Sequence, residues 1–248
     1  MEVKVYNNDD IKLQGISYYC DGYKYWDLNL CEEAFKNDYA SLIPQVNQSR
    51  FHNSNYPMAL IDLSLYKHQF NNYWDSLSSK VKRDIGIARK NKFYFKKYNF
   101  NHNIQDFSSI NHSQARTKKV NPWYLKPHEF YNGSHSGYRH KWEDDLHYSQ
   151  WYGIFKYFKH YKQGELTTNE RLFGYCKLAI DGELATIQLI WCHEEYLNKG
   201  LMFYLITSIV EEIMDTANVR CLQYYGWHQF PQWKSRMLFQ SNKFKIVL

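Results

Sequence analysis

Acidic, phenolic and imidazole side chains follow two apolar runs in the last quarter of the sequence. Glu194 comes shortly after a run that ends at Trp191, and Tyr225 closes the next run, with His228 just beyond it. A carboxylate or an imidazole can take a proton from an amine, and a tyrosine hydroxyl can give one to a leaving group. Glu194, Tyr225 and His228 are therefore candidate catalytic residues for proton transfer. The alternatives are a solvated loop for Glu194 and the protein core for Tyr225.

Cysteine and metal chemistry receive little support from the sequence. The five cysteines are scattered and form no C-x-x-C pair, so neither a disulfide framework nor a zinc site is indicated, and we expect reduced thiols. The histidines and acids between residues 128 and 147 lack a spacing such as H-E-x-x-H. We therefore expect no metal. A serine nucleophile elbow and a phosphate-binding P-loop are also absent from the sequence.

The positive charge of the chain is concentrated between Ser78 and Lys97. This segment has eight lysines and arginines against one acid, Asp84, whereas the whole chain has a net charge of +6. Such density favours polyanions, which include nucleic acid, a phosphorylated cofactor and an anionic surface. We therefore name nucleic acid as a candidate partner through residues 80–97. The alternative is a helix face that only interacts with solvent.

Length and composition set the class of protein. With 248 residues the chain can form one large domain or two small ones around a substantial core. Aromatic residues make up 19% of it, which argues against disorder. No run of about 18 apolar residues occurs, and no apolar stretch follows the N-terminus. We therefore expect a cytoplasmic protein without a membrane span.

The N-terminal and middle parts of the chain give mixed signals. Residues 57–63 form a short apolar run typical of a buried strand, and Ser64 is a candidate cap for a following helix. Ser78 or Ser79 could begin a basic helix over 80–90, with apolar residues on one face. We further expect a strand over 92–100 and helices over 104–118 and 143–161.

The C-terminal part has the clearest pattern. Strands are expected over 171–180 and 183–191, joined at Asp181-Gly182, which is a strong hairpin signal. A polar loop then ends at Gly200. A helix over 201–214, a strand over 219–225, a short helix over 232–240 and a strand over 244–248 complete the order.

This order resembles the core of the GNAT acyltransferase superfamily, and in detail its Fem-like, or BioF2-like, branch (FemABX type). The resemblance covers roughly residues 57–248, with a poor match between 121 and 141. The segments that carry it are Tyr73–Arg83, Leu172–Tyr175, Asp181–Ala185, Asn198–Leu201, Tyr224–Trp227, Trp233–Phe239 and Asn242–Phe244.

The resemblance implies an α/β (α+β) fold with a mixed, mostly antiparallel sheet flanked by helices. Residues 78–248 would form the GNAT-like domain, and residues 1–77 a half-GNAT subdomain or a substrate cap. The implied activity is transfer of an acyl or aminoacyl group to a primary amine of a sugar, a peptide or a modified nucleic-acid base. The donor would be acyl-CoA, such as acetyl-CoA, or aminoacyl-tRNA, and the amine would attack it directly.

The resemblance also assigns binding residues. Main-chain groups from Leu189 to Trp191 would stabilise the oxyanion where two neighbouring strands part. The donor phosphates would meet the turn at the start of the following helix, formed by Asn198, Lys199, Gly200 and Leu201. That turn departs from the usual Gln/Arg-x-x-Gly-x-Gly/Ala pattern, because only Gly200 agrees with it. The departure leaves both donors open.

Substrate contacts are expected near the C-terminus. Lys234 and Arg236 lie where Fem-like chains carry a lysine near the donor carbonyl or phosphate, although a simple amphipathic helix would also contain them. Trp227 belongs to an aromatic cluster that could line an acceptor pocket, stack on a base or lie in the core. A second reading of the whole chain is a nucleic-acid-binding or DNA-modification protein that keeps the GNAT-like fold without catalysis.

Overall fold

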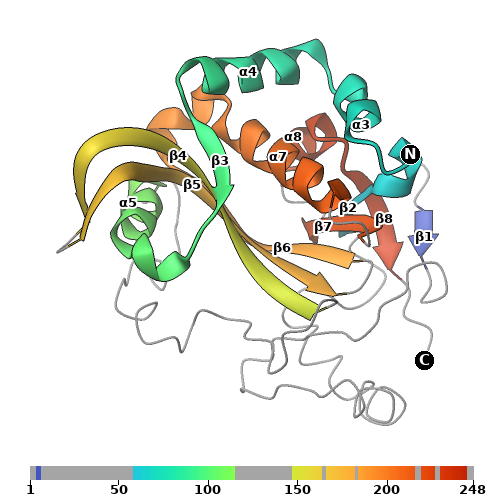
Figure 1. The fold of residues 1–248 in the computed structure, drawn as a ribbon. Helices are drawn as coiled ribbons and strands as arrows, with labels where there is room; N and C mark the ends of the chain where they lie inside the picture. Colours follow the sequence, from blue (N-terminus) through green and yellow to red (C-terminus); the bar gives the residue numbers. More distant parts are fainter. Residues whose placement is uncertain are drawn as a thin grey trace, which may run out of the picture.

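A computed structural model describes residues 4–6, 58–114, 147–163, 166–181, 184–215, 219–226 and 230–244. Within these residues a single eight-stranded sheet forms the centre of the protein, in the order β1-β8-β2-β7-β6-β5-β4-β3 (Figure 1). The strands are β1 (Lys4–Tyr6), β2 (Met58–Asp62), β3 (Tyr94–Lys97), β4 (His147–Gln163), β5 (Leu166–Asp181), β6 (Leu184–Cys192), β7 (Cys221–Gly226) and β8 (Gln240–Phe244).

Two neighbouring pairs in the sheet are parallel, β1 with β8 and β6 with β7, and the other five are antiparallel. The predicted mixed, mostly antiparallel sheet is therefore confirmed. Strands β1 and β2 both come from residues 1–77, and β2 lies between β7 and β8. The division of the chain at residue 77 stays a prediction.

Helices cover both faces of the sheet. The longer ones are α3 (Phe70–Ser76), α4 (Ser79–Lys90), α5 (Ile104–Gln114), α7 (Leu201–Asp215) and α8 (Pro231–Arg236). Three short 3-10 helices are η1 (Leu63–Tyr66), η2 (Phe100–His102) and η4 (Glu194–Lys199). One hydrophobic cluster joins α3, α4, α7 and α8 to one face, called the α7 face, and a second cluster joins α5 to the opposite face, called the α5 face.

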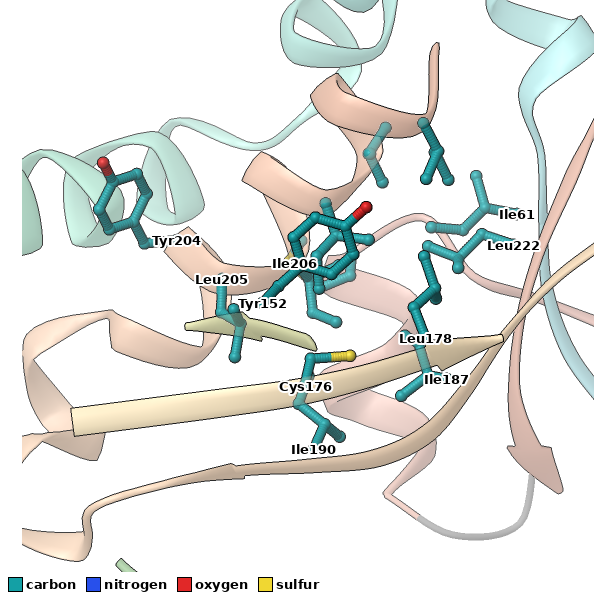
Figure 2. Close-up of a cluster of buried hydrophobic side chains, with 14 of the residues drawn as sticks. Ile61, Tyr152, Cys176, Leu178, Ile187, Ile190, Tyr204, Leu205, Ile206 and Leu222 are labelled. Carbon is teal, nitrogen blue, oxygen red and sulfur yellow. The ribbon is translucent and has the colours of Figure 1, made fainter. Parts of the chain in front are cut away.

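Helix α7 is central to the larger cluster. Ten of its fifteen residues are buried, because the sheet covers one side of it and α3 and α4 cover the other. Figure 2 shows Leu205 and Ile206 of α7 above Cys176, Leu178 and Ile190 of the sheet. This packing fixes the start of α7 relative to the end of β6.

Helix α4 forms as its sequence predicts. The Ser78 hydroxyl accepts a hydrogen bond from the Val81 main-chain N–H at 3.4 Å, which caps the helix. Val81, Ile85 and Ala88 are fully buried and share one face. The lysines and arginines of the helix therefore lie on its outer surface.

A buried carboxylate holds α5 on the sheet. Asp106 accepts hydrogen bonds from the Leu172 main-chain N–H (2.9 Å), the Tyr161 hydroxyl (2.6 Å) and the Gln163 amide (2.9 Å). Burial raises the pKa of Asp106, and the hydrogen bonds from Leu172 and Tyr161 act against that rise. This network fixes α5 over β4 and β5.

The predicted helix over 143–161 is wrong, because most of this segment belongs to strand β4. Trp151, Ile154, Phe155 and Phe158 have helical spacing. In the strand, however, Trp151 and Phe155 pack on the α5 face while Ile154 packs on the α7 face. A strand buried on both faces has no alternating pattern to distinguish it from a buried helix.

Two boundaries also differ from the predictions. Ser64 does not cap a helix. Instead the Asp62 carboxylate accepts from the Ser64 N–H at 3.1 Å and caps η1, and α3 begins at Phe70. The last described strand covers Gln240–Phe244 instead of 244–248, and α8 ends at Arg236. Among the described helices, none combines the length and the apolar character needed to cross a membrane.

Candidate active site

Strands β6 and β7 part within the sheet. Their parallel pairing covers only Leu184 with Cys221, Ala185 with Leu222 and Thr186 with Gln223. Beyond that point β6 continues to Cys192 and β7 to Gly226, and no further described pair joins them. The strands were expected to part near Trp191. They part earlier, directly after Thr186, and Trp191 lies within the separated part of β6.

A β-bulge lies just past the point of separation. Lys177 of β5 faces Leu189 while Leu178 faces Ile187, so Gln188 is an extra residue in β6. A bulge bends its strand and re-aims nearby main-chain groups. The bulge therefore bends β6 away from β7. The residues that follow it, including Leu189 and Trp191, lie on an edge of β6 that does not pair with β7.

Two buried glutamines mark the same point. The residues Gln188 and Gln223 are 6% and 3% exposed. Leu222 and Tyr224 pack on the α7 face, so Gln223 points to the other face by alternation along the strand. Its side-chain N–H₂ group has no hydrogen-bond partner among the described residues. A buried donor in that state is unfavourable by about 1–3 kcal/mol and is suited to donate a hydrogen bond to a ligand oxygen.

The sequence analysis missed both glutamines. The signal available was a polar residue within an otherwise apolar strand, Gln188 in the run that ends at Trp191 and Gln223 in the run that ends at Tyr225. Such residues are rarely buried without a role in hydrogen bonding.

Lys234 lies on the opposite side of β7, on the α7 face. It is in α8, is fully buried, and its ammonium nitrogen is 4.7 Å from the centre of the Tyr224 ring. Burial lowers its pKa from 10.5 to about 8. The side chain is therefore mostly an ammonium ion at neutral pH, but it can release its proton within the physiological range.

Aromatic rings pack beside Tyr224, the ring over which the Lys234 ammonium lies. The Trp233 ring lies 5.9 Å from that of Tyr224 and 6.4 Å from that of Phe203 in α7. The Phe239 ring is 6.3 Å from Tyr224. These rings make the surroundings of the ammonium group apolar, which strengthens any electrostatic interaction it makes. Arg236, at the end of the same helix, is exposed.

Glu194 begins η4 and lies next to α5. Its main-chain N–H donates to the Ser113 hydroxyl at 3.0 Å. Leu189 and Trp191 also pack against the α5 cluster. The structure thus brings Glu194 to the same side as these two residues, while Lys234 and Tyr224 lie on the α7 face. The neighbouring His193 has a lowered pKa because of burial and the nearby Arg171 charge.

The turn before α7 is packed against α4. Gly200 has a left-handed φ of 76°, and a Cβ atom there would overlap the main chain of Asp84. Leu201 is fully buried, Lys199 lies 4.9 Å above the Tyr196 ring, and Asn198 is exposed. Because Gly200 has no side chain, the main chain of α4 can lie directly against this turn.

Several predicted residues cannot be placed in this site. Trp227 and His228 lie outside the described residues, and of Tyr225 only the main chain, in β7, is described. The histidine-rich stretch before β4 is likewise outside them. Within the described part of the chain, no group of three or more histidine, cysteine, aspartate or glutamate side chains could hold a metal ion.

Neither a family model nor a curated protein matches the sequence. Solved structures do match in fold. One is FemX, with a TM-score of 0.50 and 5% identity over 80% of this chain and 65% of that one. Another is the C-terminal domain of an Agrobacterium fabrum protein described as a lysylphosphatidylglycerol synthetase, with a TM-score of 0.46 and 11% identity over 81% and 62%.

A third is a tandem GNAT protein of the clavulanic acid biosynthesis pathway, with a TM-score of 0.42 and 10% identity over 92% of this chain and 59% of that one. The chain spans less than two thirds of the length of each of these three proteins. At such identities only the fold can be compared, and the likeness to FemX, at a TM-score of 0.50, shows it. The expected GNAT-like fold is therefore confirmed.

Proposed function

We propose that the protein is an N-acyltransferase that moves an acyl or aminoacyl group to a primary amine by direct attack. The observation that carries this proposal is the separation of β6 from β7 after Thr186 and Gln223. Main-chain N–H groups along an unpaired strand edge can bind a carbonyl oxygen that gains negative charge. The GNAT-like fold also supports acyl transfer, as an argument from fold alone.

In the proposed reaction the amine nitrogen attacks the donor carbonyl carbon, and an N–C bond forms while the oxygen becomes negative. Main-chain groups of residues 189–191 and the Gln223 amide would stabilise that oxygen from one side, and the Lys234 ammonium from the other. The C–S or C–O bond to the leaving group then breaks. The proton lost by the amine passes to Glu194, and Tyr225 protonates the leaving group, with His228 as a further candidate for proton transfer.

The burial of Lys234 supports its part in this proposal. A cation in apolar surroundings interacts more strongly with a developing negative charge than a solvated one. Its position over the Tyr224 ring also limits its motion, so the charge is in position before the reaction.

The proposed donor is acyl-CoA, with acetyl-CoA first, or aminoacyl-tRNA. Asn198 and Lys199 could contact its phosphates with their side chains, whereas Gly200 and Leu201 are buried and could offer only main-chain groups. The proposed acceptor is an amine of a sugar, a peptide or a modified nucleic-acid base, with Trp227 and Arg236 as contacts. The buried thiol of Cys176, which forms no disulfide, supports a reducing compartment such as the cytoplasm.

The test is a transfer assay with a panel of amines, using acetyl-CoA in one arm and aminoacyl-tRNA in the other. Release of the free thiol or of deacylated tRNA measures turnover, and mass spectrometry of co-purifying small molecules identifies the donor. Lys234→Met should abolish transfer, while the exposed Lys67→Met should not change it. Absence of both binding and turnover with either donor would contradict the proposal.

The second candidate function is a nucleic-acid-binding or DNA-modification protein without acyl transfer. The contact between Gly200 and Asp84 favours it, because α4 occupies the space beside the turn that would receive donor phosphates. Steeply salt-dependent nucleic-acid binding without turnover of any donor would support this reading.

A further inference from the structure

Gly86 lies in the middle of α4, on the outer side of the helix. It is exposed, and a Cβ atom added to it would have no heavy atom within 4 Å. Glycine within a helix is unfavourable relative to alanine, because it loses more conformational freedom on folding. Unlike Gly200, this glycine is not required by packing.

Four cations surround Gly86 on the helix surface. The neighbours of a helical residue are those three and four positions away, and here they are Lys82, Arg83, Arg89 and Lys90. We call these four residues with Gly86 the Gly86 frame. At its centre the main chain has no side chain above it, so an anionic group could approach the helix backbone closely between the four charges.

Aromatic rings hold two of the four cations in place. The Lys82 ammonium lies 5.9 Å and the Arg89 guanidinium 5.6 Å from the centre of the Trp74 ring. Arg89 also lies 5.3 Å from the Tyr204 ring of α7. These contacts keep like charges near one another on the surface, which suits the binding of a multiply charged anion.

The positive surface continues beyond α4. Phe93 follows the end of α4, and the Lys156 ammonium of β4 lies 5.4 Å from its ring. The Tyr196 ring lies 5.7 Å from Phe93, with the Lys199 ammonium 4.9 Å above Tyr196. Cations from β4 and η4 therefore lie close to Phe93, which follows the end of α4.

The β4–β5 ribbon, of which residues 156–163 and 166–170 are described, extends from this point. It reaches past the ends of its neighbours in the sheet, because β3 pairs with β4 only to Phe155 and β6 pairs with β5 only from Gly174. Figure 1 shows it curling outward at the end of the molecule where α4 ends. Tyr157 is 62% and Phe158 37% exposed, and Lys159 next to them is also exposed.

We propose that the Gly86 frame, the cations around Phe93 and the β4–β5 ribbon form one binding surface, the basic track, for a nucleic-acid strand with unpaired bases. A phosphate lies on the bare main chain of Gly86, and bases stack on Phe158, whose ring packs beside Phe173 of the α7-face cluster. Stacking on aromatic rings beside a positive groove is how proteins bind single strands. The proposal does not rest on acyl transfer, because it uses none of the residues around the β6–β7 separation.

A membrane surface fits these observations less well. An interfacial helix inserts its apolar face between lipids. The apolar face of α4, formed by Val81, Ile85 and Ala88, is fully buried in the core. The helix thus offers charge without an apolar face, which matches a phosphate backbone.

The experiment measures binding of a short labelled oligonucleotide by fluorescence anisotropy over a range of salt concentrations. Single-stranded RNA, single-stranded DNA and the corresponding duplex are the arms, and vesicles of anionic phospholipid are tested by co-sedimentation. The variants are Arg83→Gln/Lys90→Gln in the frame and Phe158→Ala on the ribbon. Leu65→Ala/Lys67→Gln on η1 and the turn after it is the matched control, because it removes one exposed apolar residue and one exposed lysine outside the track.

We expect single strands to bind more tightly than the duplex, and the RNA and DNA arms then show which strand is preferred. Phe158→Ala should weaken binding about fivefold or more through lost stacking. The frame variant should lower the slope of log affinity against log salt by about 0.7–0.9 for each lost phosphate contact. The control should bind as the unmodified protein does.

Three results would overturn the proposal. One is no binding of either single strand. Another is binding that the frame and ribbon variants leave unchanged relative to the control. The third is association with anionic vesicles in place of single strands. Thermal melting of each variant shows whether it is folded, so a loss of binding with an unchanged melting temperature is assigned to the track.

Discussion

Gly200 of the turn before α7 lies directly against the main chain of Asp84 in α4. This contact, together with the left-handed φ of Gly200, joins the turn after β6 to the basic helix. The position of α4 therefore affects both the candidate active site and the surface that carries most of the positive charge.

Substitution of the two helix-associated glycines should have opposite effects on stability. Gly200→Ala should lower the free energy of unfolding by more than about 2 kcal/mol, because the left-handed conformation alone costs about 1–2 kcal/mol and the methyl group would also overlap Asp84. Gly86→Ala should raise it by about 1 kcal/mol, since the methyl group meets open space. Urea denaturation of both variants measures the difference, and a stable Gly200→Ala protein would show that α4 is not packed as described.

Gly86→Ala also separates folding from binding. The variant should be more stable than the unmodified protein yet bind single-stranded nucleic acid more weakly, because the methyl group occupies the place of the phosphate. Anisotropy and thermal melting on the same sample give both values. If the affinity is unchanged while the melting temperature rises, the phosphate does not lie at the centre of the frame.

Local chemistry made α4 and the C-terminal elements predictable. Ser78 provides the cap and Val81, Ile85 and Ala88 provide helical spacing, so one segment contains all the information needed for that helix. The Asp181-Gly182 turn likewise predicts the β5–β6 hairpin, whose strands pair from Asp181 with Leu184 onward. These features depend on residues close together in the chain.

Features that depend on distant residues were not predictable. The spacing of apolar residues in β4 predicted a helix because both faces of the strand are buried. Tyr152 lies on the α7 face and Trp151 on the α5 face. The bulge at Gln188 depends on the register with β5. The role of Gly200 depends on a helix more than a hundred residues earlier in the sequence. No local window of sequence contains these relationships.

The two glutamines Gln223 and Gln163 allow a matched test of the site. Gln223→Leu should leave stability unchanged or raise it, because the variant removes a buried donor that lacks a partner among the described residues. It should nevertheless lower acyl transfer, measured as kcat. Gln163→Leu should destabilise the protein by about 1–2 kcal/mol, since it removes the donor to Asp106. A large loss of stability in Gln223→Leu would indicate a structural amide and argue against its place in the site.

The lowered pKa of Lys234 predicts how stability depends on pH. In the unfolded chain this lysine has a pKa near 10.5, and in the folded protein the pKa is about 8. Between these values the unfolded state binds more protons, so the contribution of Lys234 to the free energy of unfolding rises as the pH increases from 8 to 10.5. Below pH 8 both states carry the proton, and the unfavourable burial of the charge is constant.

Lys234→Met keeps the length of the side chain and removes this titration. The difference in stability between the variant and the unmodified protein should therefore be largest, in favour of the variant, below pH 8 and should shrink as the pH approaches 10. The buried tyrosines have raised pKa values, and their titration affects both proteins equally. The difference in stability between the two proteins therefore reports the titration of Lys234 alone. Urea denaturation at pH 7, 8, 9 and 10 gives the curve. A difference that stays constant across this range would mean that Lys234 keeps an ordinary pKa, and its proposed role as a desolvated cation would lose its physical basis.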